Sequence, residues 1–233
     1  MRDGDVRRAV KAWLIAQHGH EHDTRLVEEM GVWSGSVRID VALINGSLSG
    51  YELKSDRDTL ERLPRQLALY GRVFDYLHLI VGRRHVEKAQ KILPEWWGIK
   101  IAVQGEQEVE LIDHHKPSPN PAPDAYLIAE LLSKEEAIGV LETFGLGKGW
   151  RSKKIRLVHE RLAKELPLRE LRDEVRAVLK QRPRGVTVCL CEPARCGGSR
   201  QVSPSTPGPL GLSLPRRSCR LSHQPSSQGD LAL

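Results

Sequence analysis

Apolar residues dominate two short stretches on either side of Asn45-Gly46. Residues 37–44 and 48–54 are rich in aliphatic and β-branched side chains, and the Asn-Gly pair between them is typical of a tight turn. The pattern predicts a β-hairpin with strands over 37–44 and 48–54. We take this hairpin as the element around which the rest of the chain is organised.

The register of the hairpin depends on the length of its turn. A two-residue turn would pair Asp40 with Tyr51 and place Asp40 and Glu52 on opposite faces of the sheet. A three-residue turn, with a left-handed residue at or beside Gly46, would pair Ile44 with Leu48 and Asp40 with Glu52. We adopt this second register because it separates polar from apolar positions. Its charged face holds Arg38, Asp40, Glu52 and Lys54, and its apolar face holds Ile39, Val41, Leu43, Tyr51 and Leu53.

Apolar periodicity predicts further helices and strands on both sides of the hairpin. A 3.6-residue period predicts a helix over 5–17, and residues 25–32 are expected to be a first strand or the end of a short helix. After the hairpin, we predict a strand over 74–81, a helix over 83–93, and a second hairpin with strands over 99–103 and 109–112. Further helices are expected over 126–132, 133–144, 151–164 and 168–182.

Pro64 leaves open where the helix after the first hairpin begins. Asp58 and Glu61 have the spacing of a capping box, which predicts a helix from about Thr59. A proline inside a helix costs about 3 kcal/mol, so a turn followed by a helix that starts at Pro64 is the alternative. Gly71 is expected to end this helix.

Composition divides the chain into four parts. Residues 1–112 contain both expected hairpins and are predicted to form an α/β core. Residues 113–124 contain four prolines and are expected to form an extended linker. Residues 125–182 are predicted as a basic helical appendage. Residues 183–233 are predicted as a disordered tail, because 21 of these 51 residues are Ser, Pro or Gly.

The net charge of +6 is unevenly distributed along the chain. Residues 148–182 carry twelve Lys or Arg and five Asp or Glu, whereas residues 1–147 carry eighteen and twenty-three. A basic helical part beside an acidic core suits a partner with a phosphate backbone. A solvated basic helix surface is the alternative interpretation.

The sequence also excludes some classes of protein. No apolar run approaches the roughly 18 residues of a membrane span, and residues 1–17 are too charged for a signal peptide, so we expect a cytoplasmic protein without a membrane partner. The four cysteines all lie in the last 45 residues, which excludes a disulfide framework for the core.

Three charged residues of the first hairpin require a partner in an otherwise apolar setting. An unpaired buried charge costs several kcal/mol, and the carboxylates of Asp40 and Glu52 would repel each other if they were adjacent. A divalent cation between them would remove the repulsion, and hard oxygen ligands suit Mg²⁺ or Mn²⁺. Lys54 would then lie where an ammonium group can stabilise the developing charge of an attacked phosphate.

Asp40 and the run Glu52-Leu53-Lys54 resemble the Asp…Glu-x-Lys signature of the PD-(D/E)xK nuclease superfamily, which has the restriction-endonuclease-like fold. Ile39 occupies the position where that signature often has proline. The pair Gln66 and Tyr70 is similar to the Gln-x-x-x-Tyr motif of the exonuclease branch. A longer pattern, over about residues 5–182, is similar to a family of nuclease-like proteins of bacteria and phages, and it comprises Arg38, Asp40, Tyr51 to Asp56, Asp58, Leu60, Arg62, Leu63, Gln66, Tyr70 and Asp75.

This resemblance implies an α/β fold with a mixed sheet flanked by helices, and metal-dependent hydrolysis of nucleic acid, with DNA favoured over RNA. The implied ligands of Mg²⁺ or Mn²⁺ are Asp40, Glu52 and the main-chain carbonyl of Leu53. The implied catalytic residues are Asp40, Glu52 and Lys54, with Gln66, Tyr70 and one upstream acid, for which Glu29 fits better and Glu28 is the fallback. Residues that could contact nucleic acid are Arg38, Arg62 and Arg65.

A second function is compatible with the same residues. A non-catalytic module that binds nucleic acid or another protein could be built on this fold, since fold alone does not determine function. The two functions differ in their need for a metal ion. The sequence leaves a homodimer open.

Overall fold

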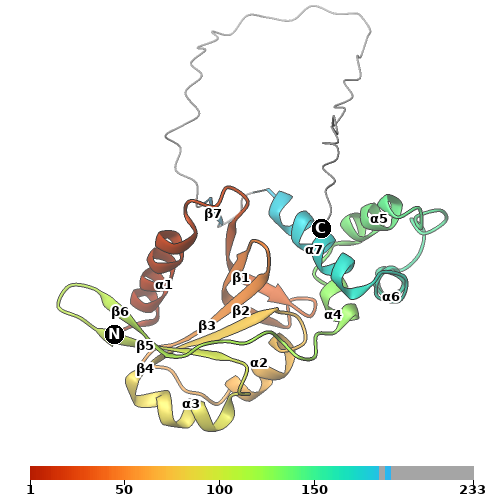
Figure 1. Cartoon of the computed structure of the whole chain (residues 1–233). Helices are drawn as coiled ribbons and strands as arrows, with labels where there is room; N and C mark the ends of the chain where they lie inside the picture. The colour runs from red at the N-terminus through yellow and green to blue at the C-terminus, as the bar shows by residue number, and fades with distance from the viewer. Residues whose placement is uncertain (184–186, 190–233) are drawn as a thin grey trace, which may run out of the picture. The chain divides into compact units, whose positions relative to one another are not determined.

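A mixed β-sheet forms the centre of the computed structural model, which describes residues 1–183 and 187–189 (Figure 1). The described residues belong to one unit of the chain, Met1–Arg195. Its strands are β1 Arg25–Val32, β2 Val37–Ile44, β3 Leu48–Lys54, β4 Tyr76–Gly82, β5 Gly98–Gln104, β6 Val109–His115 and β7 Thr187–Cys189. Its helices are α1 Asp3–His18, α2 Leu63–Tyr70, the 3₁₀ helix η1 Arg83–His85, α3 Val86–Ile92, α4 Ala125–Ala129, α5 Lys134–Thr143, α6 Ile155–Glu165 and α7 Leu168–Gln181.

The strands follow the order β6-β5-β4-β3-β2-β1, and the short β7 extends the sheet beside β1. The neighbours β3, β4 and β5 run parallel, whereas the other adjacent strands are antiparallel. The predicted α/β class, the mixed sheet and the C-terminal helical region are therefore confirmed.

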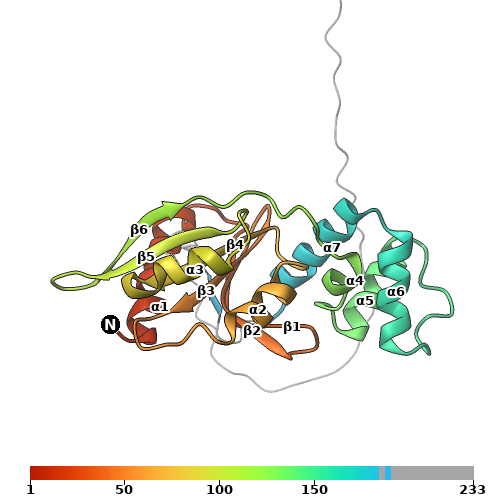
Figure 2. The same cartoon turned by 90° about the horizontal axis from the view of Figure 1, so that it is seen from below.

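Each face of the sheet carries its own hydrophobic cluster. On one face, α1 contributes Val6, Val10 and Leu14, which are fully buried in a cluster with Val41 and Leu53 of the first hairpin. The second cluster contains buried residues of the sheet together with residues of α2 and of all four C-terminal helices. Helices therefore cover both faces, and the C-terminal helices lie together at one side of the sheet in both views (Figures 1 and 2).

The hairpin has the register of the three-residue turn, as predicted. Ile44 pairs with Leu48, and the ladder continues to Val41 and Tyr51. The prediction of a left-handed residue in the turn was wrong, because Asn45, Gly46 and Ser47 all lie outside the left-handed region. The side-chain oxygen of Asn45 instead accepts a hydrogen bond of 3.0 Å from the backbone N–H of Ser47, which closes the turn.

Ile39 lies on the opposite face from the one predicted. The ladder between β2 and β3 ends at Val41, and beyond it the strict alternation of side chains is lost. Ile39 belongs to the cluster on the α2 face, where a Cβ added to Gly50 would lie only 2.4 Å from its Cδ1. Gly50 thus leaves the space into which Ile39 turns.

The helix α2 begins at Leu63 with Pro64 in its first turn, so the second alternative for this helix is correct. Asp58 does not cap a helix. Its carboxylate accepts hydrogen bonds of 2.7 Å from both the N–H and the hydroxyl of Ser55. Ser133 caps α5 through a capping box with Glu136. The helix expected from Arg151 begins only at Ile155.

The proline-rich stretch 113–124 begins inside β6, which extends to His115. Asn120 then donates its side-chain amide to the main-chain oxygens of Gly71 and Phe74, at 2.8 and 2.7 Å. The N–H of Asp124 donates to the oxygen of Arg72 at 2.8 Å. These bonds hold the stretch along the connection between α2 and β4.

Two groups of polar contacts attach α7 to the sheet. Asp75 forms ion pairs with Arg172 at 2.8 Å and Arg176 at 3.2 Å, and it accepts a hydrogen bond from the N–H of Leu48. At the other end of the helix, Arg25 of β1 donates to the last main-chain oxygens of α7. Buried Asp75 therefore has a structural role.

None of the described helices has the length and apolar character that a membrane-crossing segment requires. Of the tail predicted over 183–233, the structure describes Pro183 and the strand β7. Residues 184–186 and 190–233 lie outside the described part.

Candidate metal and nucleic-acid site

Asp40 and Glu52 lie on adjacent strands, next to the point where the pairing of β2 and β3 ends. The ladder ends at the Val41–Tyr51 pair, and Asp40 and Glu52 are the next residues of the two strands beyond that pair. The Oδ2 of Asp40 accepts a hydrogen bond of 2.8 Å from the backbone N–H of Leu53, the residue that follows Glu52. The structure thus brings together the two carboxylates that the sequence predicted as a pair.

Glu52 is the most deeply buried carboxylate of the site, with an exposed fraction of 1%. Its Oε1 accepts from the ammonium of Lys54 at 2.5 Å and from the amide of Gln66 at 2.7 Å. Its Oε2 is buried without a hydrogen-bond partner. Burial, followed by the negative charge of Asp40, raises the pKa of Glu52 to about 7.

Asp40 is held by the guanidinium of Arg7 from α1. Arg7 donates to Oδ1 of Asp40 at 2.7 Å and to its main-chain oxygen at 3.0 Å. Burial raises the pKa of Asp40, although the bond from Leu53 and the positive charges of Arg7 and Lys54 oppose the rise. Its side chain remains 18% exposed, so the carboxylate is accessible from solvent.

The two upstream acids both face α1 but differ in their contacts. Glu29 forms an ion pair of 2.8 Å with Arg7, which connects it to Asp40 through a shared guanidinium, and its side chain is 51% exposed. Its φ of 52° is unusual for a residue within a strand and marks a local distortion of β1 opposite Asp40. Glu28 instead pairs with Lys11. Of the two predicted acids, Glu29 is the one that joins the Asp40 cluster.

Gln66 and Tyr70 lie one helical turn apart on α2, on the side that faces β2 and β3. Gln66 contacts Glu52 directly, and its own Oε1 is buried without a partner. The hydroxyl of Tyr70 donates to the main-chain oxygen of Arg38 at the start of β2. Burial and the neighbouring Glu52 raise the pKa of Tyr70, which keeps the hydroxyl protonated and able to donate this bond.

Arg38, Arg62 and Arg65 are all exposed. None of the three forms an ion pair within the described residues. Arg38 follows the turn that leads into β2, and Arg62 and Arg65 flank the start of α2. Their charges are thus available to an external anion close to the paired carboxylates.

The donor set at this site fits a divalent cation only with help from the main chain. No group of three or more His, Cys, Asp or Glu side chains arranged for a metal ion occurs among the described residues. The proposed set has two carboxylates, from Asp40 and Glu52, and a carbonyl, from Leu53. The partnerless Oε2 of Glu52 and Oε1 of Gln66 are buried acceptors that a cation or its hydration water would satisfy.

Sequence reasoning missed Arg7 as a member of the site. The helix 5–17 was correctly predicted from its apolar period, but its polar positions were not assigned a role. Arg7 follows the buried Val6, and Lys11 lies one turn further on, where it pairs with Glu28. Two basic residues at i and i+4 beside an apolar stripe were the available signal.

Comparison with known proteins shows that this chain is similar to a phage protein family. The model of the family described as bacteriophage P4 protein cII matches residues 2–201. Protein cII of Enterobacteria phage P4 is 26% identical over 182 residues, which cover 78% of this chain and 68% of that protein. A solved structure of a protein of unknown function from Silicibacter pomeroyi is 21% identical and aligns over 66% of this chain and 98% of its own, with a TM-score of 0.37. A TM-score this low supports no conclusion about the fold.

Proposed function

This chain belongs to the family of bacteriophage P4 protein cII, and we propose that it is a metal-dependent nuclease of the PD-(D/E)xK type. Its substrate would be nucleic acid, with DNA favoured, and its reaction the hydrolysis of a phosphodiester bond. The observation that carries the proposal is the hydrogen bond of Asp40 to the backbone N–H of Leu53, the residue next to Glu52, together with Lys54 and Gln66 on the Glu52 carboxylate.

Burial without a partner supports a cation at this position. A buried oxygen that lacks a donor costs about 1–3 kcal/mol, and both Glu52 and Gln66 contain one. Mg²⁺ or Mn²⁺ held by Asp40, Glu52 and the carbonyl of Leu53 would supply Lewis acidity and offset the repulsion between the two carboxylates. Glu29, which shares Arg7 with Asp40, is suited to support the cation from a second layer.

The remaining residues of the site have roles in charge compensation and positioning. The ammonium of Lys54 lies beside Glu52, where it can stabilise negative charge that develops on a phosphate. Gln66 orients the Glu52 carboxylate, and Tyr70 fixes the start of β2 through the oxygen of Arg38. Arg38, Arg62 and Arg65 would contact phosphates of the substrate.

One observation favours a second function, a non-catalytic module that binds nucleic acid or a protein. Both carboxylates already have basic partners within the chain, Arg7 for Asp40 and Lys54 for Glu52. A site neutralised in this way has less need of a cation than two unpaired acids would have. The two functions can be distinguished by experiment: the nuclease should cleave nucleic acid in a metal-dependent way, whereas the binding module should not cleave it.

Cleavage by the wild-type chain and by Asp40→Asn tests the proposal. We expect wild type to cleave at least one substrate among single-stranded, duplex and branched DNA and RNA in Mg²⁺ or Mn²⁺, and to be inactive in EDTA. Asp40→Asn should lower the rate by about 10²–10⁴-fold, because it removes a ligand charge while preserving the shape of the side chain. The matched control is Glu87→Gln on α3, which also converts a carboxylate to an amide, but at an exposed position.

Two results would contradict a nuclease. Wild type that leaves the whole substrate panel intact in both metals would favour the binding module. Cleavage by Asp40→Asn at the wild-type rate would show that the activity does not arise at this site. Calorimetric titration with Mn²⁺ gives an independent measurement. Only the nuclease requires that the chain bind Mn²⁺ and that Asp40→Asn weaken this binding.

A further inference from the structure

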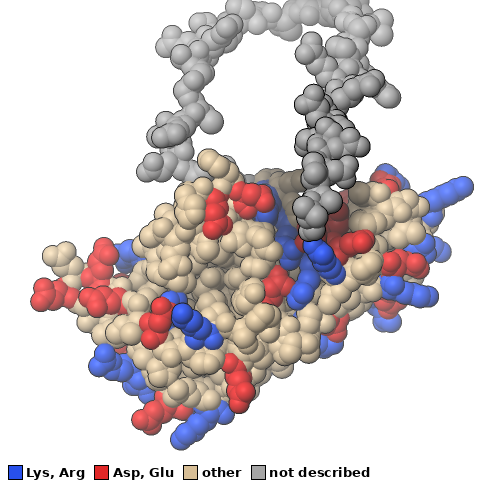
Figure 3. Space-filling view, in the orientation of Figure 1, with Lys and Arg blue, Asp and Glu red and all other residues tan. Residues whose placement is uncertain are grey.

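A basic loop between α5 and α6 lies in the C-terminal helical region, away from Asp40 and Glu52. The loop, residues 144–154, and the start of α6, residues 155–157, together contain five basic and no acidic residues: Lys148, Arg151, Lys153, Lys154 and Arg156. Elsewhere in the C-terminal helices, acidic residues are interspersed among the basic ones. Figure 3 shows Lys and Arg side chains projecting from the part of the molecule that α5 and α6 form.

Three lysines of this loop differ from its arginines in having no ionic partner among the residues that the structure describes. Arg151 binds Glu142 at 2.7 Å and Arg156 binds Glu160 at 2.9 Å, which neutralises both arginines locally. Lys148, Lys153 and Lys154 are exposed and form no ion pair within the described residues. The loop therefore presents about three positive charges that no described acidic residue neutralises. These charges are free to interact with solvent or with a partner.

The loop is a fixed structure. Gly145 has a φ of 71° and ends α5 in a Schellman motif, in which its N–H bonds to the oxygen of Glu142 and the N–H of Leu146 to that of Leu141. Leu146 and Trp150, which lie on either side of Lys148 in the sequence, both pack against the hydrophobic cluster. A Cβ on Gly147 would lie 2.4 Å from the Cγ of Glu142, so the chain crosses close over α5.

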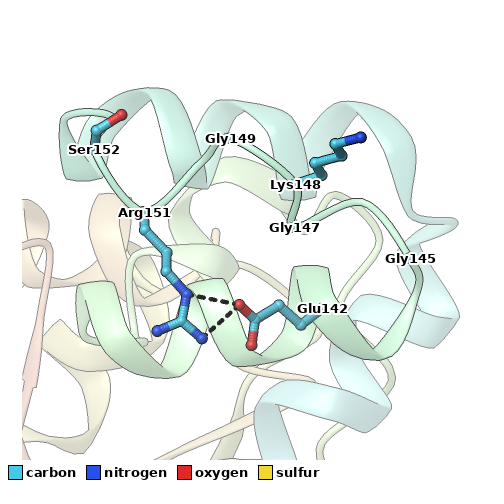
Figure 4. Close-up of a pocket in the computed structure, with 7 residues that line it drawn as sticks. All are labelled: Glu142, Gly145, Gly147, Lys148, Gly149, Arg151 and Ser152. Atoms are coloured by element: carbon cyan, nitrogen blue, oxygen red, sulfur yellow. Dashed lines mark hydrogen bonds and ion pairs between the residues drawn. The ribbon is translucent and has the colours of Figure 1, made fainter.

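These constraints leave an open hollow of about 500 Å³ at the loop, lined by Glu142, Gly145, Gly147, Lys148, Gly149, Arg151 and Ser152. Figure 4 shows Arg151 directed at Glu142, with Lys148 and Ser152 extending away from that pair. The N–H groups of Lys148 and Gly149 donate no hydrogen bond to other described residues. Ammonium, hydroxyl and backbone N–H groups are the donors that proteins use to bind phosphate oxygens.

Apolar side chains beside the lysines indicate an extended partner. Phe144, Ile155 and Leu157 have exposed fractions of 37, 43 and 42%, and they are three of the six large apolar residues exposed in the described part of the chain. A small anion would contact the lysines alone. The sugars and bases of a nucleic acid offer apolar surface beside each phosphate.

We propose that the loop between α5 and α6, residues 144–154, is a second nucleic-acid contact, which binds the phosphate backbone at a distance from the carboxylate pair. The inference rests on the proposed function only in taking nucleic acid as the partner. It assigns the loop a role in affinity that does not require a metal ion or cleavage.

Binding of a labelled duplex of about 30 base pairs to the full chain in EDTA tests this contact. Fluorescence anisotropy is measured over a series of salt concentrations for wild type and for the triple variant Lys148→Gln, Lys153→Gln, Lys154→Gln. The control triple variant, Lys88→Gln, Lys91→Gln, Lys116→Gln, removes three exposed lysines elsewhere that form no ion pair with other residues in the described part of the chain. Both variants lose three charges, so only the location differs.

The loop variant should bind at least 10-fold more weakly at about 100 mM salt. The slope of log K against log salt should become shallower by about 2–3, since each lost phosphate contact contributes about 0.9. The control should change affinity by less than about 3-fold. Ser152→Asp, which adds a negative charge to the hollow without removing a lysine, should weaken binding in the same direction. Thermal unfolding of each variant verifies that the fold is retained.

Three outcomes would overturn the inference. The first is an equal loss of DNA affinity in the two triple variants, and the second is unchanged DNA affinity in the loop variant. The third is a loss of polyglutamate binding by the loop variant, measured in the same assay, that equals its loss of DNA binding. The last outcome would show that the loop binds polyanions in general and has no preference for a phosphate backbone. Failure of the two proposals can be distinguished. A chain that binds DNA through the loop but never cleaves it contradicts only the nuclease, and a nuclease whose loop variant binds like wild type contradicts only the loop contact.

Discussion

At the scale of single residues, Glu52 combines deep burial with a neighbouring negative charge. Its pKa rises from 4.5 to about 7. Between these pH values the folded protein retains a proton that the unfolded chain has released. The free energy of unfolding therefore falls as the pH rises from about 4.5 to about 7, by up to about 3 kcal/mol, and stays low above that range.

Glu52→Gln should remove this dependence, because an amide does not ionise. In EDTA at pH 8.5, the variant should be more stable than wild type by about 1–3 kcal/mol, and the difference should shrink toward zero near pH 4.5. Urea unfolding at several pH values measures both curves. Exposed Glu87→Gln is the control and should follow wild type. A constant offset between Glu52→Gln and wild type at all pH values would contradict a raised pKa.

The residues of the site differ in how far the sequence could predict them. Asp40 and Glu52 were predicted as neighbours because charges within apolar strands require a partner and the hairpin register follows from turn length. Arg7 was not predicted, because its partner Asp40 lies 33 residues away and nothing local specifies which polar face of α1 meets β2. Ile39 was assigned to the wrong face because the alternation rule fails where the ladder ends.

At the scale of elements, the end of α7 depends on a residue far from it in sequence. The guanidinium of Arg25 donates to the main-chain oxygens of Leu179 and Arg182, at 2.8 and 2.6 Å, and also to those of Lys180 and Pro183. The last carbonyls of a helix lack intrahelical partners, and a cation there also interacts favourably with the helix dipole. Arg25 thus replaces a glycine cap and attaches α7 to β1.

Arg25→Ala should destabilise the fold by about 2 kcal/mol, because several carbonyls lose a charged donor at once. The amides of the last turn of α7 should exchange hydrogen faster than those of α1. Arg25→Lys should recover less than half of the loss, since a single ammonium cannot reproduce the planar fork of donors. Arg169→Ala, at an exposed position of the same helix, is the control. Unchanged exchange in Arg25→Ala would show that the cap does not limit the opening of α7.

Elements with a strong local signal were predicted to within a few residues. The strands β2 and β3 match their predicted bounds, since alternating apolar residues and an Asn-Gly turn agree there. The start of α2 was ambiguous because a capping-box spacing competed with Pro64, and the structure uses Asp58 to close a turn instead. The parallel order of β3, β4 and β5 could not be derived from periodicity, which does not encode the neighbours of a strand.

At the scale of the whole molecule, the C-terminal helices complete the core of the sheet. One continuous cluster contains Ile39 and Leu77 of the sheet together with Leu127, Leu162 and Leu171 of the helices. Ion pairs of Asp75 with Arg172 and Arg176 reinforce this contact. Without the helices, part of the apolar surface on the α2 face of the sheet would meet water.

The fragment 1–122, which ends before α4, should therefore lose cooperative unfolding. Exposure of apolar surface disfavours the folded state by about 25 cal/mol per Å², so loss of a few hundred Å² of contact removes most of a typical domain's stability. We expect the fragment to bind a hydrophobic dye and to unfold over a broad temperature range, whereas the full chain unfolds in a single sharp transition. Adding the separate fragment 123–195 should restore part of the cooperativity. A sharp, dye-free transition of 1–122 alone would show instead that the helices are an appendage on a self-sufficient core.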